Sequence, residues 1–241
     1  YLAHYLFESN ASSKYIKSFV NTYKINHLKF VDRKWINLNN FIYRKLKKLP
    51  NFNLSFTVYS PIEGYLHLGE NTNKKLKLQN LIRKNINYKD ILYIRLSLSK
   101  YQRFHCPYKL KLINIEFERG DLLYPKPKGF YKNEFMTKNE KCILEFEYPN
   151  KKKIHMILIG SKFLNSIILN KKILNRWIYP GEELGYFKFF GNYIILASER
   201  HILYTIPNIN NYETRINLGD IIGNFDYDKN TLLINDIYEI K

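Results

Sequence analysis

The chain has 241 residues, of which 45% are hydrophobic, so it can bury one sizeable core with an appended segment, and this composition excludes a disordered chain. Its 39 Lys and Arg residues outnumber 21 acidic residues, and the net charge of +18 favours a polyanionic partner such as RNA or an anionic membrane surface. The chain is also rich in Asn, Lys, Ile and Tyr, the bias of an AT-rich genome, which explains the charge equally well.

The amino-terminal part predicts two amphipathic helices. Apolar residues recur at helical spacing from Tyr15 to Tyr23, with lysines between them and Ser12 and Ser13 available as caps. Residues 38–49 combine apolar and basic side chains and end at Pro50, which favours a second helix. Such helices either cover the core of their own domain or lie on a membrane.

Beyond Pro50 the sequence pattern changes to short runs of Ile, Leu, Tyr and Phe that are separated by glycines. This pattern is typical of strands. The sequence therefore predicts an α+β, mainly β class, with a helical segment over residues 1–50 and a β sandwich or barrel over residues 51–241. The predicted strands are residues 55–59, 91–97, 109–118, 141–148, 154–159, 192–198 and 231–238.

Several features restrict the environment of the chain. Cys106 and Cys142 lie far apart, which fits a reducing compartment and excludes a disulfide framework and a zinc pattern. The longest apolar run, residues 154–169, is interrupted by polar residues, so we expect no transmembrane segment. The sequence begins at Tyr1 and not at a methionine, so we expect its natural start, and any targeting peptide, to lie upstream.

Five separated motifs together resemble the phosphatidylserine decarboxylase family, in the order of that family. The most specific is YQRFHCP at residues 101–107, which is similar to the family signature Tyr-His-Arg-Phe-His-Ser-Pro. The others are WINLNNFIYRKLK (35–47), SPIEG (60–64), GDLLYP (120–125) with NEK (139–141), and IGS (159–161) leading through NSI (165–167) to GEELGYF (181–187). The resemblance extends from about Tyr15 to Gly223 and implies a decarboxylase-like fold.

The resemblance also implies a chemistry. Family members turn a serine that follows a glycine into a pyruvoyl group, which forms a Schiff base with the substrate amine and accepts electrons during decarboxylation. At the matching place this chain has Gly191 followed by Asn192, and an amide neither forms the intermediate ester nor eliminates. Ser198 follows Ala197 and not a glycine, so we do not expect it to substitute. We therefore expect no pyruvoyl cofactor.

The supporting positions of the family are altered as well. Its aspartate corresponds to Glu63, and the first histidine of its signature corresponds to Gln102, which takes no proton near neutral pH. His105 remains, although a single histidine beside an apolar strand is more often structural, and Cys106 should point away from it. We thus expect no catalytic residue among Glu63, Gln102, His105, Gly191 and Asn192, and no metal site, since His4, His27, His67, His155 and His201 are scattered.

Three functions remain open. The first is a non-catalytic structural subunit of a larger, mitochondrial or related organellar assembly, such as a ribosome or a respiratory complex, with the basic surface against rRNA or protein. The second is a lipid-binding or membrane-surface protein that keeps the ancestral pocket and contacts anionic headgroups. The third is an active phosphatidylserine decarboxylase of phospholipid biosynthesis that is processed elsewhere or borrows a cofactor.

Overall fold

The structure is a computed structural model that describes residues 7–31, 35–52, 56–68, 82, 86–97, 99–121, 136, 138–160, 166–171, 173–206 and 213–225. Its helices are η1 (Asn10–Ser12), α2 (Ser13–Thr22), η2 (His27–Lys29) and α3 (Leu38–Ile42). Its strands are β1 (Thr57–Tyr59), β2 (Gly64–Leu68), β3 (Asp90–Arg95), β4 (Arg103–His105), β5 (Leu110–Glu118), β6 (Lys141–Glu147), β7 (Lys153–Gly160), β8 (Ile167–Leu169), β9 (Trp177–Ile178), β10 (Glu183–Phe187), β11 (Gly191–Ser198), β12 (Ile202–Tyr204), β13 (Thr214–Ile216) and β14 (Ile221–Phe225).

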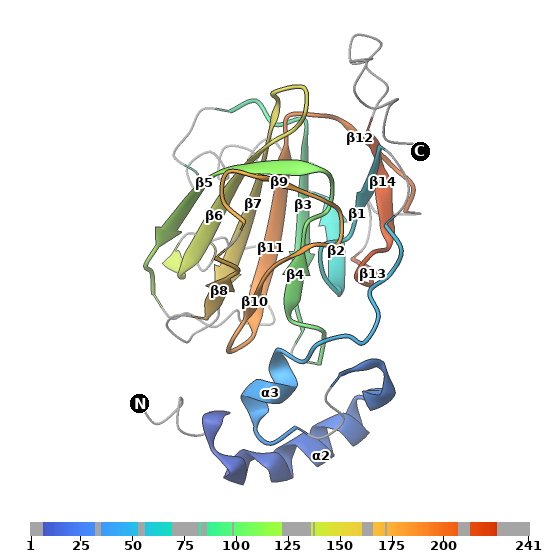
Figure 1. Cartoon of the computed structure of the whole chain (residues 1–241), viewed down its shortest axis with the longest axis vertical. Coiled ribbons are helices and arrows are strands. Elements are labelled where there is room, and N and C mark those ends of the chain that lie inside the picture. Colours follow the sequence, from blue (N-terminus) through green and yellow to red (C-terminus); the bar gives the residue numbers. More distant parts are fainter. Residues whose placement is uncertain are drawn as a thin grey trace.

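These strands form antiparallel sheets above a layer of helices (Figure 1). The largest sheet has the order β13-β2-β3-β11-β7-β6-β5-β9, and two three-stranded sheets have the orders β1-β14-β12 and β4-β10-β8. The predicted mainly β class is confirmed. Six of the seven predicted strands overlap described strands, and residues 231–238 lie outside the described residues. The strands that sequence patterns missed are mostly two to five residues long, too short for a visible alternation.

The large sheet is buried on both faces, which explains why its central strands are almost continuously apolar. Leu92 and Ile94 face the main core, which the two small sheets close from the other side. Ile91 and Tyr93, their neighbours in β3, face a second cluster to which Ile82 also contributes. Successive side chains thus alternate between two apolar environments.

The first predicted helix is confirmed as α2, with Ile16 buried and Tyr15 exposed. Ser12 precedes it but makes no side-chain hydrogen bond to the helix. Its hydroxyl instead donates to Ser9 O at 2.7 Å and accepts from the Leu38 N–H at 3.0 Å. The predicted cap therefore joins the two helical segments.

The prediction of a helix over residues 38–49 is wrong beyond Ile42, where α3 ends. The following backbone pairs with an earlier segment instead: the Val31 N–H donates to Lys45 O at 2.8 Å, and the Lys47 N–H donates to Lys29 O at 3.0 Å. These hydrogen bonds satisfy the backbone outside a helix, and the periodicity of the side chains did not reveal them.

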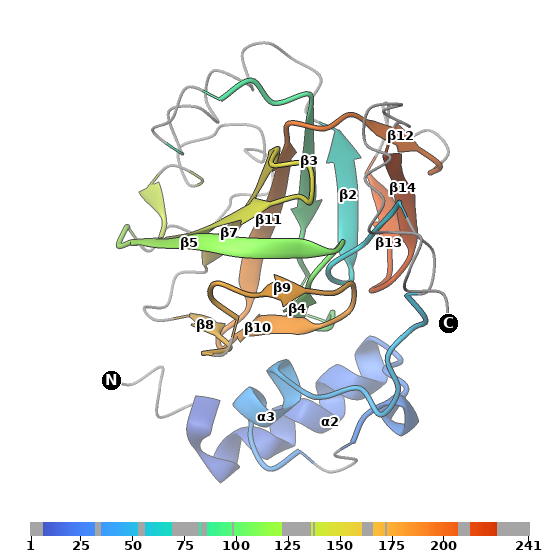
Figure 2. The ribbon, with the colours of Figure 1, turned by 45° about the horizontal axis from the view of Figure 1, so that its top comes forward.

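The helical layer is attached to the β domain beneath β10 and β11 (Figure 2). Phe7 packs edge-on against Phe189 with ring centroids 5.4 Å apart, and Glu8 pairs with Lys188 at 2.7 Å. Buried Arg44 donates to Ser99 O at 2.9 Å, and burial lowers the pKa of Arg44 to about 10, so its guanidinium stays charged at neutral pH. The boundary between residues 50 and 51 stays a prediction.

Candidate functional site

The Gly191–Asn192 bond lies at the start of β11, in the middle of the large sheet. Gly191 pairs with Gly160 of β7, and the register shifts between Gly191 and Tyr193. Phe190, just before it, has a positive φ of 68°, a conformation that costs a non-glycine residue about 1 kcal/mol. A Cβ on Gly191 would lie 2.7 Å from Leu96 Cδ1 and 2.7 Å from Phe187 Cδ2, so a larger residue here would require these side chains to shift.

Gln102 contacts this segment directly. The Gly191 N–H donates to Gln102 Oε1 at 3.0 Å, and Gln102 Nε2 donates to Ser97 O at 2.9 Å. The structure thus brings together two of the positions that the sequence singled out. Because a carboxamide neither gives nor takes a proton near neutral pH, residue 102 holds the backbone here and supplies no base.

Asn192, on the other side of the Gly191–Asn192 peptide bond, is held by two hydrogen bonds. Its Nδ2 donates to Gly160 O at 2.7 Å, and its own carbonyl accepts from the Leu96 N–H at 2.9 Å. Its side chain therefore serves as a hydrogen-bonding group between β11 and β7. An amide in this position is not an oxygen nucleophile.

Glu63 lies beside two cationic side chains. Its carboxylate pairs with Lys100 Nζ at 2.6 Å and approaches Arg215 at 3.5 Å. No contact described in the structure joins Glu63 to Gly191 or Asn192. The retained charge at position 63 is therefore neutralised by cations.

His105 is also separate from the Gly191 segment as far as the described contacts show. Its Nδ1 lies 2.7 Å from Gly181 O and its Nε2 lies 3.1 Å from the Tyr101 hydroxyl. Burial lowers the pKa of His105 and raises the pKa of Tyr101, so both stay neutral. The geometry fits an imidazole that donates from Nδ1 and accepts at Nε2.

This arrangement predicts a pH dependence of folding. Because the pKa of His105 is lower in the folded state, the unfolded chain binds the proton first as pH falls from about 6.5, and stability decreases there by up to about 1.4 kcal/mol per pH unit. The His105→Gln variant should show a shallower decrease in unfolding free energy in urea titrations between about pH 7 and 5. The Phe117→Ala variant, altered at an exposed side chain that takes no proton, should keep the slope of the wild type. Equal slopes in His105→Gln and wild type would show that His105 does not titrate on unfolding.

The cysteine beside His105 is not a thiol nucleophile. Cys106 Sγ donates to Tyr108 O at 2.9 Å, and burial raises its pKa to about 12. Ser198 lies at the far end of β11, where its hydroxyl is 3.0 Å from the Tyr148 hydroxyl and donates to Arg200 O at 2.8 Å. Neither side chain has a described contact with the Gly191–Asn192 bond.

Three residues of the family-like motifs, Asn139, Glu140 and Ser166, lie near the Gly160–Asn192 contact, and the sequence assigned no role to them. Glu140 Oε2 accepts from both the N–H and the hydroxyl of Ser166, at 3.2 and 3.1 Å. Asn139 Nδ2 donates to Gly160 O at 3.4 Å. The motif positions themselves were the signal for this cluster, because sequence spacing does not show that β7 lies between β6 and β11.

The remaining histidines are dispersed. His155 Nδ1 lies 3.0 Å from the Tyr88 hydroxyl, His201 Nδ1 lies 2.8 Å from Asp90 Oδ2, and His67 stacks on Tyr93. His4 and the side chain of His27 lie outside the described part. Among the residues that the structure describes, no three His, Cys, Asp or Glu side chains could together hold a metal ion.

Residues 38–224 match the family model for phosphatidylserine decarboxylase, and this match covers most of the chain. The chain belongs to the phosphatidylserine decarboxylase family. The match includes both sides of the Gly191–Asn192 bond, so this bond lies within the family domain.

Individual relatives agree with this assignment. The chain is 27% identical to phosphatidylserine decarboxylase proenzyme 2 of Saccharomyces cerevisiae over 90% of its own length, but it spans only 21% of that protein. It is 27% identical to the proenzyme of Clostridium novyi, of which it spans 81%, and 29% identical to that of a Clostridium botulinum strain, of which it spans 80%.

Proposed function

We propose that this chain is a non-catalytic member of the phosphatidylserine decarboxylase family. The observation that carries the proposal is Asn192, whose amide stands where the family requires the serine hydroxyl and is bonded to Gly160 O. The residues present therefore do not fit a pyruvoyl group. Gln102 supports the same proposal. Its carboxamide accepts a hydrogen bond from the Gly191 N–H and neither gains nor loses a proton near neutral pH.

The proposal is tested by the reaction of the family. The purified 241-residue chain is incubated with detergent-dispersed phosphatidylserine labelled at the serine carboxyl, and released carbon dioxide is counted. A clostridial proenzyme serves as the positive control. We expect release at the level of the buffer blank. Release that rises with the amount of this chain would contradict the proposal and favour an active decarboxylase.

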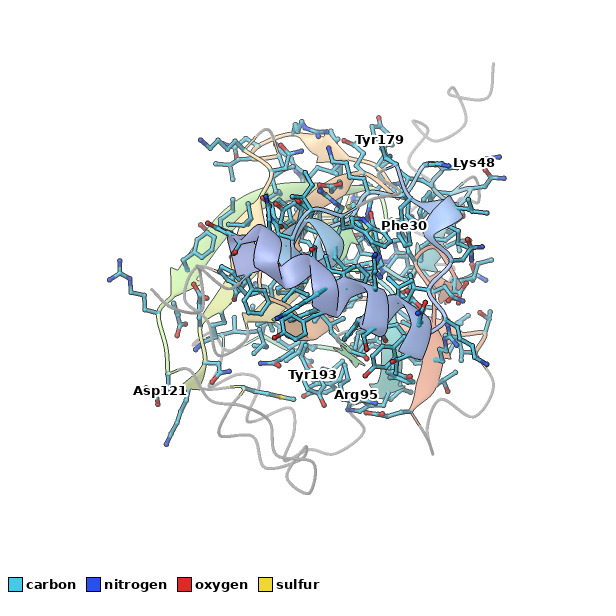
Figure 3. The ribbon with its side chains drawn as sticks, turned by 90° about the horizontal axis from the view of Figure 1, so that it is seen from below. Phe30, Lys48, Arg95, Asp121, Tyr179 and Tyr193 are labelled. Atoms are coloured by element: carbon cyan, nitrogen blue, oxygen red, sulfur yellow. The ribbon has the colours of Figure 1, made fainter. Side chains whose placement is uncertain are left out.

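The surface of the helical layer supports a binding role. Residues 1–50 contain ten Lys or Arg and two acidic residues, Glu8 and Asp32, which gives a local net charge of +8. Figure 3 looks onto this layer, with α2 crossing the underside of the domain. Seven of the thirteen exposed large hydrophobic side chains of the described part lie between positions 15 and 56: Tyr15, Tyr23, Leu28, Val31, Ile36, Leu49 and Phe56.

This combination favours an anionic membrane surface among the candidate partners. Exposed apolar side chains can enter the interface, and each nearby Lys or Arg contributes about 1 kcal/mol to binding at an anionic leaflet. In the part of the chain that the structure describes, no helix has the length and apolar character needed to span a bilayer. The contact that we propose is a peripheral one.

The other proposed role is that of a structural subunit in a mitochondrial or related organellar assembly such as a ribosome or respiratory complex, which the same basic and apolar surface would suit. Flotation with vesicles of phosphatidylcholine and phosphatidylserine separates the two roles. Binding to vesicles by the pure chain, weakened by high salt and by Ile36→Ser, favours the membrane. Absence of flotation together with sedimentation of the native protein with rRNA favours the assembly.

A further inference from the structure

Gln102 connects three segments of the β domain. Its Nε2 donates to Ser97 O beyond β3, its backbone carbonyl accepts from the Phe187 N–H at the end of β10, and its Oε1 accepts from the Gly191 N–H at the start of β11. The whole residue is buried. Every one of these contacts involves backbone, so they depend on the shape of residue 102 and not on a charge.

Asn192 completes the arrangement from the opposite side. Its Nδ2 reaches Gly160 O, and its carbonyl receives the Leu96 N–H. Between these two carboxamides lies a segment that needs support, because Phe190 has a positive φ and the register shifts directly after Gly191. A strained turn persists only where its surroundings fix it.

We propose that Gln102 and Asn192 form an amide clamp that fixes the Gly191–Asn192 bond as a structural joint. This inference rests on the proposed loss of catalysis and adds that residue 102 is a positioning residue for the joint. In the reaction of the family, a serine hydroxyl at position 192 would attack the Gly191 carbonyl carbon and form a C–O ester bond while the C–N bond between residues 191 and 192 breaks, and the hydroxyl proton would pass to the freed nitrogen. A carboxamide at position 102 transfers no proton in that step, so restoring a serine at position 192 leaves the bond intact.

Amide hydrogen exchange, followed by NMR, tests the clamp. The Gln102→Met variant keeps the size of the side chain and removes both side-chain hydrogen bonds. We expect the Gly191 amide to exchange about tenfold faster than in wild type, as the loss of one hydrogen bond to a buried donor implies. The amide of Ile195, at the centre of β11, is the internal reference and should change less than about threefold.

The outcomes are decisive in both directions. An unchanged Gly191 rate, or a rise equal to that of Ile195, would overturn the clamp. Should Gln102→Met fail to fold, Gln102→Asn, which is shorter by one methylene, is measured under the same criteria. Intact mass of Asn192→Ser gives an independent readout, for which we expect one uncut chain. Cleavage of that variant alone would refute the role inferred for Gln102 and leave the proposed lack of catalysis in the wild type standing, whereas cleavage of the wild type would refute the proposed function.

Discussion

The Phe187→Ala variant is expected to lose about 3–5 kcal/mol of unfolding free energy. Phe187 is 0% exposed, and its ring packs on Phe104 with centroids 5.2 Å apart. The same ring lies against Gly191, where a Cβ would be 2.7 Å from Phe187 Cδ2. The truncation therefore opens a cavity in the main core and removes the ring that packs against Gly191. Urea denaturation monitored by circular dichroism measures the loss.

Phe117→Ala is the matched control, because Phe117 is 56% exposed on β5. The same truncation there should change the unfolding free energy by less than about 1 kcal/mol. A similar loss in both variants would mean that Phe187 does not occupy the core position described here.

The Gly185→Ala variant is expected to destabilise the protein by about 3 kcal/mol or more. Gly185 lies in β10, the central strand of its sheet, where it pairs with Phe104 and with Leu169. A Cβ on Gly185 would overlap the carbonyl oxygen of Ile168 and lie 2.8 Å from Phe104 Cζ. Since the first of these atoms belongs to the backbone, β8 would have to move away from β10.

Asn114→Ala on β5 is the control for this substitution, because Asn114 is an exposed strand residue that already has a Cβ. Its effect should stay within about 0.5 kcal/mol by the same urea assay. A fully folded Gly185→Ala protein with wild-type stability would show that β8 and β10 are not packed as closely as described.

Much of the fold followed from local sequence patterns. The apolar runs in residues 141–148 and 154–159 predicted β6 and β7, because strands buried on both faces are apolar over nearly their whole length. The helix over residues 38–49 failed beyond Ile42, since the backbone of residues 45–47 pairs with residues 29–31. Such pairing between distant segments leaves no periodicity to detect.

The site could be predicted only in part. Resemblance to the family singled out Gln102, Gly191 and Asn192, and the structure places Gln102 against Gly191. The resemblance did not predict the partners of Glu63 and His105, because a motif gives the identity of a residue and not the direction of its side chain. Lys100 draws Glu63 into an ion pair, and Gly181 O and Tyr101 hold His105.

Intact mass spectrometry of the purified wild-type chain tests the central claim most directly. If position 192 forms no pyruvoyl group, the chain appears as one species of 29.1 kDa that does not react with a carbonyl-specific hydrazide. Two fragments that meet at Gly191 and Asn192, the second with a hydrazide-reactive amino terminus, would contradict the account.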